Sequence, residues 1–491
     1  MSDDVRVLRL VDMLLRRKGP PFQRLLHAFI SIALRLFFRR IETSRASLVP
    51  TEGPLVFVLN HPNGGIDPAL VFAALPRRIS FLAKSTLFRM PLVGSLLRTL
   101  ETLPLYRRVD AGADVAAGAD VTQNRLTFEA CRELLRRGRC VALFPEGVSH
   151  NAPGLLPVKT GAARIALGAI SVGGSVGNHI ERGGEAVETR QPLELKIVPV
   201  GLYYTSKTSF RSEALLRFGE ALDVRPVELD EQGEPPREAV RELSARIESA
   251  LRDVTLNAET EEQLDVVRKA ERLFSSIYEG LNVELPLAAR FDFLRRLTAG
   301  RWAEWLTSAH GGIDDLRRRI TRYEEELRRI GLTPENLSLS RHSRWYVFRH
   351  FLLRTVLLVA LAPLALAGAA LHYPAYILCV LLARLFPKHG VDEIAPTIKI
   401  LGAMLLMPLT WLVVAGVTFF QWGWRAGAIA FPLSILCGYV ALRCFEEAHD
   451  MRGWFRAVLL LLRRRRLFLR LLLERRALRG EISRMGGDAG D

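Results

Sequence analysis

The chain has 491 residues, and because a typical domain has about 100 to 200 residues, two or more structural units are expected. Its 68 basic and 52 acidic side chains leave a formal charge of +16, while 49% of the residues are hydrophobic, which excludes a disordered polycation. Both properties fit a basic protein at an anionic membrane. Nucleic acid is the competing partner, but the sequence shows no nucleic-acid-binding motif, so we expect none to be bound.

Five cysteines are present, with neither the C-x-x-C spacing of a zinc site nor the density of a disulfide framework. We expect reduced packing residues and no metal site. The sequence opens with Met1-Ser2-Asp3-Asp4, which is acidic and lacks the apolar core of a secretory signal. We therefore expect the soluble part of the protein to lie in the cytoplasm.

Residues 1–45 are predicted to form an interfacial region around one amphipathic helix. Residues 22–40 are mostly apolar, but Arg35, Arg39 and Arg40 make the stretch too charged to cross a bilayer about 30 Å thick. A helix of this kind lies in the membrane interface with its apolar face among the acyl chains. A buried core helix with outward-pointing arginines is the alternative.

Residues 46–225 are predicted to form an α/β domain with a mixed sheet flanked by helices. Short apolar, β-rich runs alternate with helical patterns, as in the helix expected at 127–138. The expected strands are 54–60, 79–84, 140–146 and 196–204. Residues 171–191 are polar and rich in glycine, so we expect an exposed loop there.

Residues 226–345 are predicted to form a helical subdomain. Val240, Leu243, Ile247 and Leu251 recur at helical spacing, and further stripes of this kind follow. The subdomain is expected to pack on the α/β domain or on lipid headgroups, and no residue in it indicates chemistry.

Residues 346–450 are predicted to form a transmembrane region, followed by a basic cytoplasmic tail at 451–491. The runs 355–383, 400–424 and 426–442 contain no Asp, Glu or Lys and no Arg. A break between Gly368 and Pro374 would turn the first run into a hairpin and give four spans rather than three. If the arginine-rich tail and the α/β domain are both cytoplasmic, the number of spans is even, which favours four.

One motif combines a histidine and a carboxylate. Asn60-His61-Pro62 follows a predicted strand, and Asp67-Pro68 begins the next helix. A neutral imidazole can remove a hydroxyl proton when a carboxylate fixes its tautomer and stabilises the imidazolium that forms. Two structural alternatives stay open, because Asp67 also suits a helix N-cap and His61 could simply end the strand.

A second block, Phe144-Pro145-Glu146-Gly147, ends another apolar strand. The carboxyl ends of strands are where α/β folds place their ligand-binding loops. Glu146 could instead cap a turn that Gly147 opens. Ser149 and His150 are close to Glu146 in the sequence, and we expect them to support the site rather than to contact a substrate.

These two blocks resemble motifs one and three of the glycerolipid acyltransferase superfamily. Leu103-Pro104-Leu105-Tyr106-Arg107-Arg108 resembles motif two, and Ile197-Val198-Pro199-Val200-Gly201 resembles motif four. The four motifs occur in the order of the family, although the resemblance covers only the α/β part of the chain.

The resemblance implies a catalytic pair and a phosphate site. His61 would be the general base on the acceptor hydroxyl, and Asp67 would orient it. Arg107, with Arg108 as a helper, would bind the phosphate of the acceptor, for which a guanidinium group is chemically suited. The two arginines could instead be a solvated pair after a strand.

The resemblance also implies residues that shape the pocket. Glu146 and Gly147 would position the glycerol portion of the acceptor, and Pro199 would form the floor of the pocket. Pro199 could instead be an edge-strand proline. Lys159 and Arg164 are a further basic pair near the third motif, with either a substrate-binding or a surface role.

The implied reaction is acyl transfer from acyl-CoA or acyl carrier protein, so neither a metal nor a redox cofactor is expected. Five residues separate His61 from Asp67 where the family usually has four, and Val148-Ser149-His150 replaces the usual Thr-Arg-Ser. Both variants resemble the glycerol-3-phosphate/dihydroxyacetone-phosphate acyltransferase branch, which favours the sn-1 hydroxyl of glycerol-3-phosphate. The alternatives are a 1-acylglycerol-3-phosphate (lysophosphatidate) acyltransferase and, from another class, a non-catalytic membrane lipid-binding protein.

Overall fold

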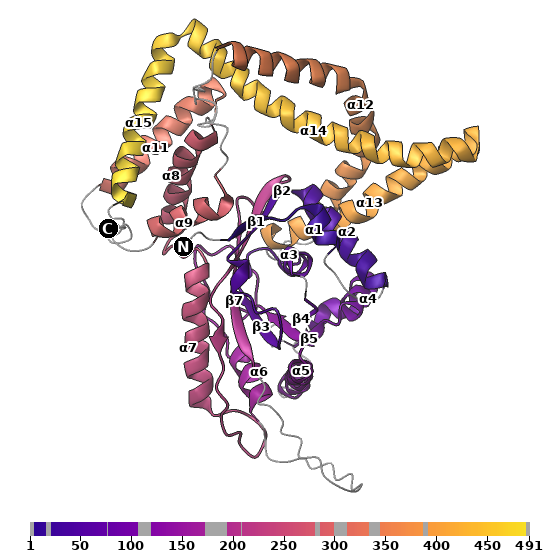
Figure 1. The fold of residues 1–491 in the computed structure, drawn as a ribbon, viewed down its shortest axis with the longest axis vertical. Coiled ribbons are helices and arrows are strands. Elements are labelled where there is room, and N and C mark those ends of the chain that lie inside the picture. Colours follow the sequence, from indigo (N-terminus) through magenta and orange to yellow (C-terminus); the bar gives the residue numbers. More distant parts are fainter. Residues whose placement is uncertain are drawn as a thin grey trace. The chain divides into compact units, whose positions relative to one another are not determined.

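The structure is a computed structural model that describes residues 4–15, 21–75, 77–106, 119–171, 194–207, 209–279, 285–298, 312–332, 344–385 and 391–487. The chain divides into two compact units (Figure 1). The first comprises Met1–Leu256 with Asp392–Ile394, and the second comprises Asn257–Val391 with Ala395–Asp491.

The first unit is built around a mixed sheet, as the sequence predicts. In the described residues it has nine strands in the order β1-β2-β8-β7-β3-β6-β4-β5, and β9 also pairs with β7. The strands are β1 (Val5–Val7), β2 (Phe38–Ser44), β3 (Leu55–Leu59), β4 (Ile79–Lys84), β5 (Leu103–Leu105), β6 (Cys140–Leu143), β7 (Lys196–Tyr204), β8 (Ser212–Phe218) and β9 (Leu222–Asp223).

The centre of this sheet is parallel. Strand β3 pairs in parallel with β6 on one side and with β7 on the other, and all five of its residues are buried. A strand with helices on both faces and partners at both edges reads as a continuous apolar run, which explains the sequence LVFVL. Strands β3, β6 and β7 therefore end at one edge of the sheet, where their loops meet.

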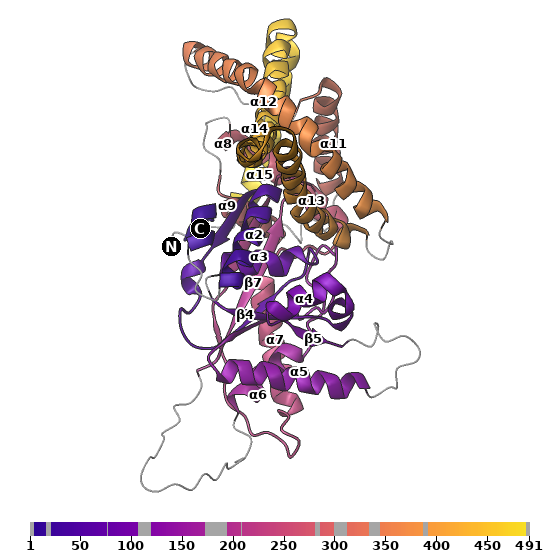
Figure 2. The ribbon, with the colours of Figure 1, turned by 90° about the vertical axis from the view of Figure 1, so that its right-hand side faces the viewer.

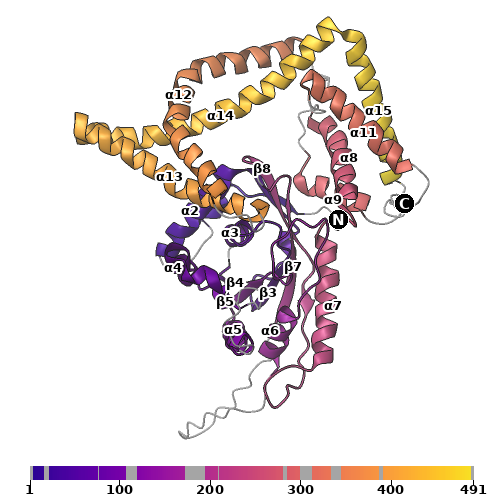
Figure 3. The ribbon, with the colours of Figure 1, turned by 180° about the vertical axis from the view of Figure 1, so that it is seen from behind.

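The helices of the first unit are α1 (Leu10–Leu15), α2 (Pro21–Phe37), α3 (Ile66–Ala74), α4 (Pro91–Thr99), α5 (Ala119–Arg136), α6 (Gly161–Ile170) and α7 (Arg237–Val254), with 3₁₀ turns at Ala46–Leu48 and Ser85–Arg89. Figure 2 shows α5 and α6 side by side, and Figure 3 shows α7 beside β7.

Helix α2 has two apolar faces rather than one. Ile30, Leu34 and Phe37 are buried in the unit, whereas the other face exposes a stripe of five large apolar side chains, Phe22, Leu25, Phe29, Ile32 and Leu36. The sequence presented the core helix and the interfacial helix as alternatives, and the geometry is compatible with both at once. The helix is also shorter than expected, because residues 38–44 form the strand β2.

The boundary of the first unit lies at Leu256 rather than at the predicted residue 225. The reason is α7, whose stripe of Val240, Leu243, Ile247, Leu251 and Val254 is part of the hydrophobic cluster of the α/β domain. Backbone contact is close here, because a Cβ at Gly201 of β7 would collide with the carbonyl of Val254.

The helices of the second unit are α8 (Glu261–Glu279), α9 (Leu287–Thr298), α11 (Gly312–Ile330), α12 (Arg344–Leu385), α13 (Val391–Trp422), α14 (Trp424–Arg463) and α15 (Arg465–Gly487). Ion pairs join α15 to α11, at 2.8 Å between Arg319 and Glu481 and at 2.6 Å between Arg470 and Glu326. Tyr323 of α11 is fully buried, and burial raises the pKa of its hydroxyl group.

Three helical segments of this unit are long and apolar enough to cross a membrane: Phe351–Leu382, Gly402–Trp422 and Trp424–Leu460. The hairpin expected between Gly368 and Pro374 is absent, because α12 continues through this segment as one helix. The predicted hairpin is therefore wrong, and three candidate spans, rather than the favoured four, are found in the described residues. Gly368 permits close helix packing instead of a turn, since a Cβ there would collide with the carbonyl of Cys437 in α14.

The contribution of α7 to the first unit can be tested on a fragment of residues 1–256 in mild detergent. We expect Ile247→Ala to lower the free energy of unfolding by about 2–5 kcal/mol, because it leaves a cavity in a packed core. The exposed Ser249→Ala on the same helix is the control and should change it by less than about 0.5 kcal/mol. Urea unfolding measures both, and equal effects would show that α7 is not part of this core.

Candidate active site

The site lies where the loops after β3 and β6 meet the end of β7. Asn60, the first residue after β3, bonds the main chain of Leu202 in β7 twice: its Oδ1 accepts from the amide at 2.7 Å and its Nδ2 donates to the carbonyl at 3.1 Å. These bonds continue the β3–β7 pairing past the last residue of β3. They fix the point from which the His61 loop departs.

The structure brings His61 and Asp67 into contact. The Nδ1 atom of His61 lies 2.8 Å from Oδ2 of Asp67, whose side chain is fully buried, while the His61 side chain is 18% exposed. Gly64 adopts a φ of +40°, which bends the loop so that five intervening residues still allow the contact.

Asp67 is not an N-cap, because it lies inside the first turn of α3 and the cap residue is Gly65. Its Oδ2 accepts the backbone N–H of Asn63 at 2.8 Å, and its Oδ1 accepts the hydroxyl of Tyr204 at 2.6 Å. Burial and the neighbouring Asp67 carboxylate raise the pKa of Tyr204 well above its usual value, so this hydroxyl keeps its proton and donates.

This arrangement determines the tautomer of a neutral His61. When Nδ1 donates to the Asp67 carboxylate, Nε2 has no hydrogen and is an acceptor. The imidazole ring also stacks on Phe144, with centroids 4.0 Å apart and an interplanar angle of 18°. The ring is therefore held through its Nδ1 atom and on one face, and its Nε2 is left as an acceptor.

Glu146 bonds groups of the protein with both oxygens. Its side chain is fully buried; Oε1 accepts the backbone N–H of His61 at 2.8 Å, and Oε2 accepts the backbone N–H of Leu156 at 3.0 Å and contacts Nε2 of His150. The carboxylate thus connects the third motif to the first. The turn itself depends on Gly147, which has a φ of +76° and leaves room for the side chain of Lys159.

Pro199 is buried within β7, at the point where the outer partner of that strand changes. From Val200 onward β7 pairs with β8, and up to Ile197 it pairs with β9. A proline without a backbone N–H is tolerated at such a transition. Pro199 lies below the edge that bears His61, opposite Val58 of β3.

Arg107 and Arg108 lie outside the described residues. The residue before them is held firmly, because Asn124 of α5 bonds the main chain of Tyr106 at 3.0 Å through the amide and at 2.7 Å through the carbonyl. Motif two is therefore anchored up to Tyr106.

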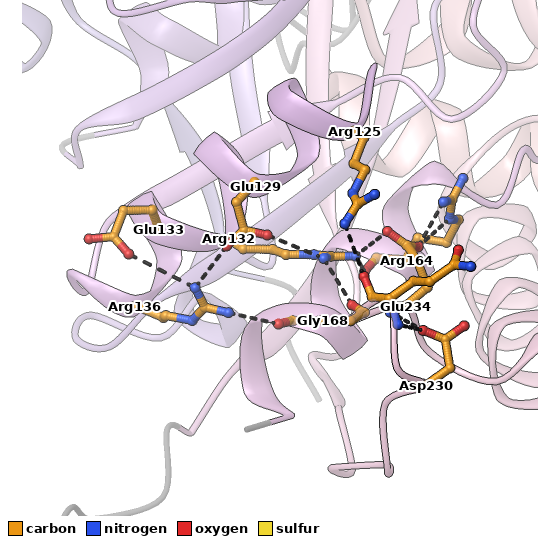
Figure 4. A network of polar contacts seen from close by, with 11 residues as sticks. Arg125, Glu129, Arg132, Glu133, Arg136, Arg164, Gly168, Asp230 and Glu234 are labelled. Atoms are coloured by element: carbon orange, nitrogen blue, oxygen red, sulfur yellow. Dashed lines mark hydrogen bonds and ion pairs between the residues drawn. The ribbon is translucent and has the colours of Figure 1, made fainter. Parts of the chain in front are cut away.

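Arg164 has a structural role. Its guanidinium bonds Glu234 at 3.0 and 2.7 Å, and Arg132 bonds the same carboxylate at 3.2 Å (Figure 4). This network holds the segment 230–234 against α5 and α6, so the surface alternative applies to Arg164. Lys159 is exposed, and its side chain covers Gly147.

Sequence reasoning included Asn60 in the first motif without a role, and it missed Tyr204 and Lys207 as parts of this site. Tyr204 ends β7 at the same edge as His61, so the parallel pairing of the predicted strands could have indicated it. Lys207 donates through Nζ to the His150 carbonyl at 3.0 Å and to Oδ1 of Asn151 at 2.8 Å. It follows the end of β7, where nothing in the sequence marks it.

A histidine–carboxylate pair at the carboxyl ends of parallel strands, bonded to a second carboxylate from a neighbouring loop, is compatible with general-base chemistry on a hydroxyl group. Two family models match the chain: Acyltransferase over residues 40–202, and Glycerol-3-phosphate acyltransferase 2 C-terminal domain over residues 266–486.

Curated relatives agree with these matches. Glycerol-3-phosphate O-acyltransferase 2 of Saccharomyces cerevisiae is 31% identical over 60% of this chain and 37% of the yeast protein. Glycerol-3-phosphate O-acyltransferase 1 of the same yeast is 24% identical over 77% of this chain and 58% of its own length. A chloroplastic 1-acyl-sn-glycerol-3-phosphate acyltransferase of Arabidopsis thaliana is 26% identical over 30% of this chain and 39% of the plant protein.

These matches support the glycerol-3-phosphate acyltransferase branch of the glycerolipid acyltransferase superfamily. The chain spans between about a third and three fifths of the length of these three relatives.

The hydroxyl of Tyr204 provides a test of the site. We expect Tyr204→Phe to leave a buried Asp67 oxygen without its donor, which costs about 1–3 kcal/mol and lowers the midpoint of thermal unfolding by several degrees. The matched control is Tyr376→Phe, which removes a hydroxyl from an exposed side chain. If both variants unfold at the wild-type temperature, the bond to Asp67 does not stabilise the fold.

Proposed function

We propose that this chain transfers a fatty acyl group from acyl-CoA or acyl carrier protein to the sn-1 hydroxyl of glycerol-3-phosphate. The observation that supports this most is the His61–Asp67 pair, whose geometry leaves Nε2 of His61 as an acceptor on a partly exposed ring. The similarity to two yeast glycerol-3-phosphate acyltransferases supports the acceptor.

In the proposed reaction, Nε2 of His61 takes the proton of the acceptor hydroxyl as its oxygen attacks the thioester carbonyl. The new C–O bond forms, the C–S bond breaks, and the imidazolium returns the proton to the departing thiolate. Asp67 stabilises the positive charge on His61 during the step. Because the hydroxyl of Tyr204 and the backbone N–H of Asn63 also donate to Asp67, the carboxylate cannot rotate away from the ring of His61.

The remaining roles are proposals of the same kind. Arg107 and Arg108 would bind the phosphate of the acceptor, following the anchored Tyr106. Gly147 and Pro199 would shape the pocket. The contacts of Glu146 favour a role in orienting His61 over direct contact with the glycerol portion, because both oxygens already bond protein groups.

A 1-acylglycerol-3-phosphate acyltransferase is the second candidate, supported by the similarity of the α/β part to the plant enzyme. A lipid-binding protein without turnover is less well supported. Such a protein has no use for a buried carboxylate that orients a histidine tautomer.

Acyl transfer by purified protein in detergent tests the function. With a labelled acyl donor and equal concentrations of glycerol-3-phosphate, dihydroxyacetone phosphate and lysophosphatidate, we expect the label to appear mainly in the first product. His61→Ala should lower the rate by about 10²–10⁴-fold, because it removes the base. His449→Ala, at an exposed histidine of α14, is the control and should keep the wild-type rate.

Preferential labelling of lysophosphatidate would instead identify the second candidate. Wild-type rates in the His61→Ala variant would remove the base from its assigned role.

We also propose that the segments before and after the apolar helices lie on one face of the membrane, and that this face is cytoplasmic. The α11–α15 ion pairs join the two segments directly. Helices α12 and α14 are antiparallel at their polar ends, where Arg354 lies 2.7 Å from Glu447. Arginines 463–466 favour the cytoplasmic side. If all three apolar helices crossed the membrane, the segments before and after them would lie on opposite sides. The proposal therefore requires that one of the three does not cross completely.

Cysteine reporters in a cysteine-free background test this arrangement. We expect exposed positions Glu262 of α8 and Arg476 of α15 to react with a membrane-impermeant maleimide from the same side of sealed vesicles. A third reporter at Gly423, between two candidate spans, shows whether the opposite face is reached. Reaction of Glu262→Cys and Arg476→Cys from opposite sides would contradict the proposal.

A further inference from the structure

A second histidine, His150, has both ring nitrogens engaged by the protein. Its Nδ1 accepts the backbone N–H of Ala152 at 3.1 Å, and its Nε2 contacts Oε2 of Glu146. Its own backbone N–H donates to the carbonyl of His61 at 3.2 Å. The side chain is 17% exposed and lies beside a fully buried carboxylate.

These partners settle the tautomer of the neutral ring. A backbone amide can only donate, so Nδ1 of His150 is the acceptor and the ring hydrogen is on Nε2. That hydrogen points to Glu146. The ring therefore joins a backbone donor to a buried carboxylate and leaves no nitrogen for a substrate.

The same carboxylate bonds the main chain of the catalytic base. Oε1 of Glu146 accepts a hydrogen bond from the backbone N–H of His61 at 2.8 Å. Oε2 accepts one from the backbone N–H of Leu156 and contacts Nε2 of His150. With His150 absent, Glu146 keeps one backbone donor on each oxygen but loses the third of its described donors. The carboxylate would then be held less tightly, and with it the backbone of His61.

We propose that His150 is a positioning residue of the acyl-transfer reaction, which acts through Glu146 to hold the main chain of His61. This inference rests on the proposed function. Lys207 strengthens the arrangement, because its ammonium bonds the His150 carbonyl at 3.0 Å. A base displaced by about 1 Å can lose about a hundredfold in rate, so a residue that never contacts the substrate can determine kcat.

Two amide substitutions separate the two ring nitrogens. In His150→Gln the terminal amide can replace Nε2 and donate to Glu146. In His150→Asn the shorter side chain places its oxygen near the position of Nδ1, so it can accept from Ala152 but cannot reach Glu146. If the donor to Glu146 is what matters, the glutamine variant should function and the asparagine variant should not.

Steady-state kinetics of the purified full chain test this design. We expect His150→Asn to lower kcat by about tenfold to a hundredfold at an unchanged KM for both substrates, and His150→Gln to stay within about threefold of wild type. His449→Asn and His449→Gln, at an exposed histidine, should leave kcat unchanged. Equal losses in the two His150 variants, no loss in either, or a change confined to KM for the acceptor would overturn the proposal.

Two further measurements keep the outcome decisive. If His150→Asn reduces the folded yield, a double-mutant cycle of His150→Ala, which removes the donor, with Glu146→Gln should show non-additive losses in kcat, and additive losses would overturn the coupling. Nitrogen-15 NMR of histidine-labelled wild-type protein should show His150 with its hydrogen on Nε2 even if no acyl acceptor is turned over. A hydrogen on Nδ1 would overturn the inference, whereas absence of turnover by wild type would refute only the proposed function.

Discussion

The structure of the site depends on two buried carboxylates that must be satisfied by hydrogen bonds. A carboxylate removed from water without partners is costly, so Asp67 and Glu146 select the one loop arrangement that supplies donors to both. Asp67 accepts hydrogen bonds from the backbone N–H of Asn63, the hydroxyl of Tyr204 and the ring of His61. Glu146 accepts hydrogen bonds from the backbone N–H groups of His61 and Leu156 and contacts the ring of His150. Since these donors come from the loops after β3 and β6 and from the end of β7, the carboxylates fix the loops as well as the histidine.

Much of the first unit could be predicted from its sequence because its signals are local. The strands β3, β4, β6 and β7 are short apolar runs, and parallel pairing brings their ends together. Strand β2 was missed because FRRIETS has no apolar alternation and follows directly on a helix. Parallel pairing of the predicted strands could have placed Tyr204 near His61. Its bond to Asp67 and the orientation of Glu146 required the register between strands, which a single sequence does not contain.

In the second unit, glycine and proline, which usually mark turns in water-soluble proteins, lie inside a long apolar helix. Gly368 and the following Pro374 suggested a turn, yet both lie within α12. Inside a helical cluster, glycine allows two backbones to approach, and other helices help to satisfy the groups that proline leaves unbonded. The same segment contains His372, a polar side chain that is not among Asp, Glu, Lys and Arg. It accepts the indole N–H of Trp411 at 2.8 Å and so connects α12 to α13.

The two histidines of the site show how neighbouring imidazoles acquire different tasks. Each lies against a buried carboxylate, so the carboxylate alone does not make a base. His61 bonds Asp67 through Nδ1, and in the described residues its Nε2 has no protein partner. His150 bonds Glu146 through Nε2 and a backbone amide through Nδ1. In the proposed mechanism, only an unoccupied nitrogen on a partly exposed ring can take a proton from a substrate. The backbone N–H of Ala152, which occupies Nδ1 of His150, therefore distinguishes the proposed positioning residue from the proposed base.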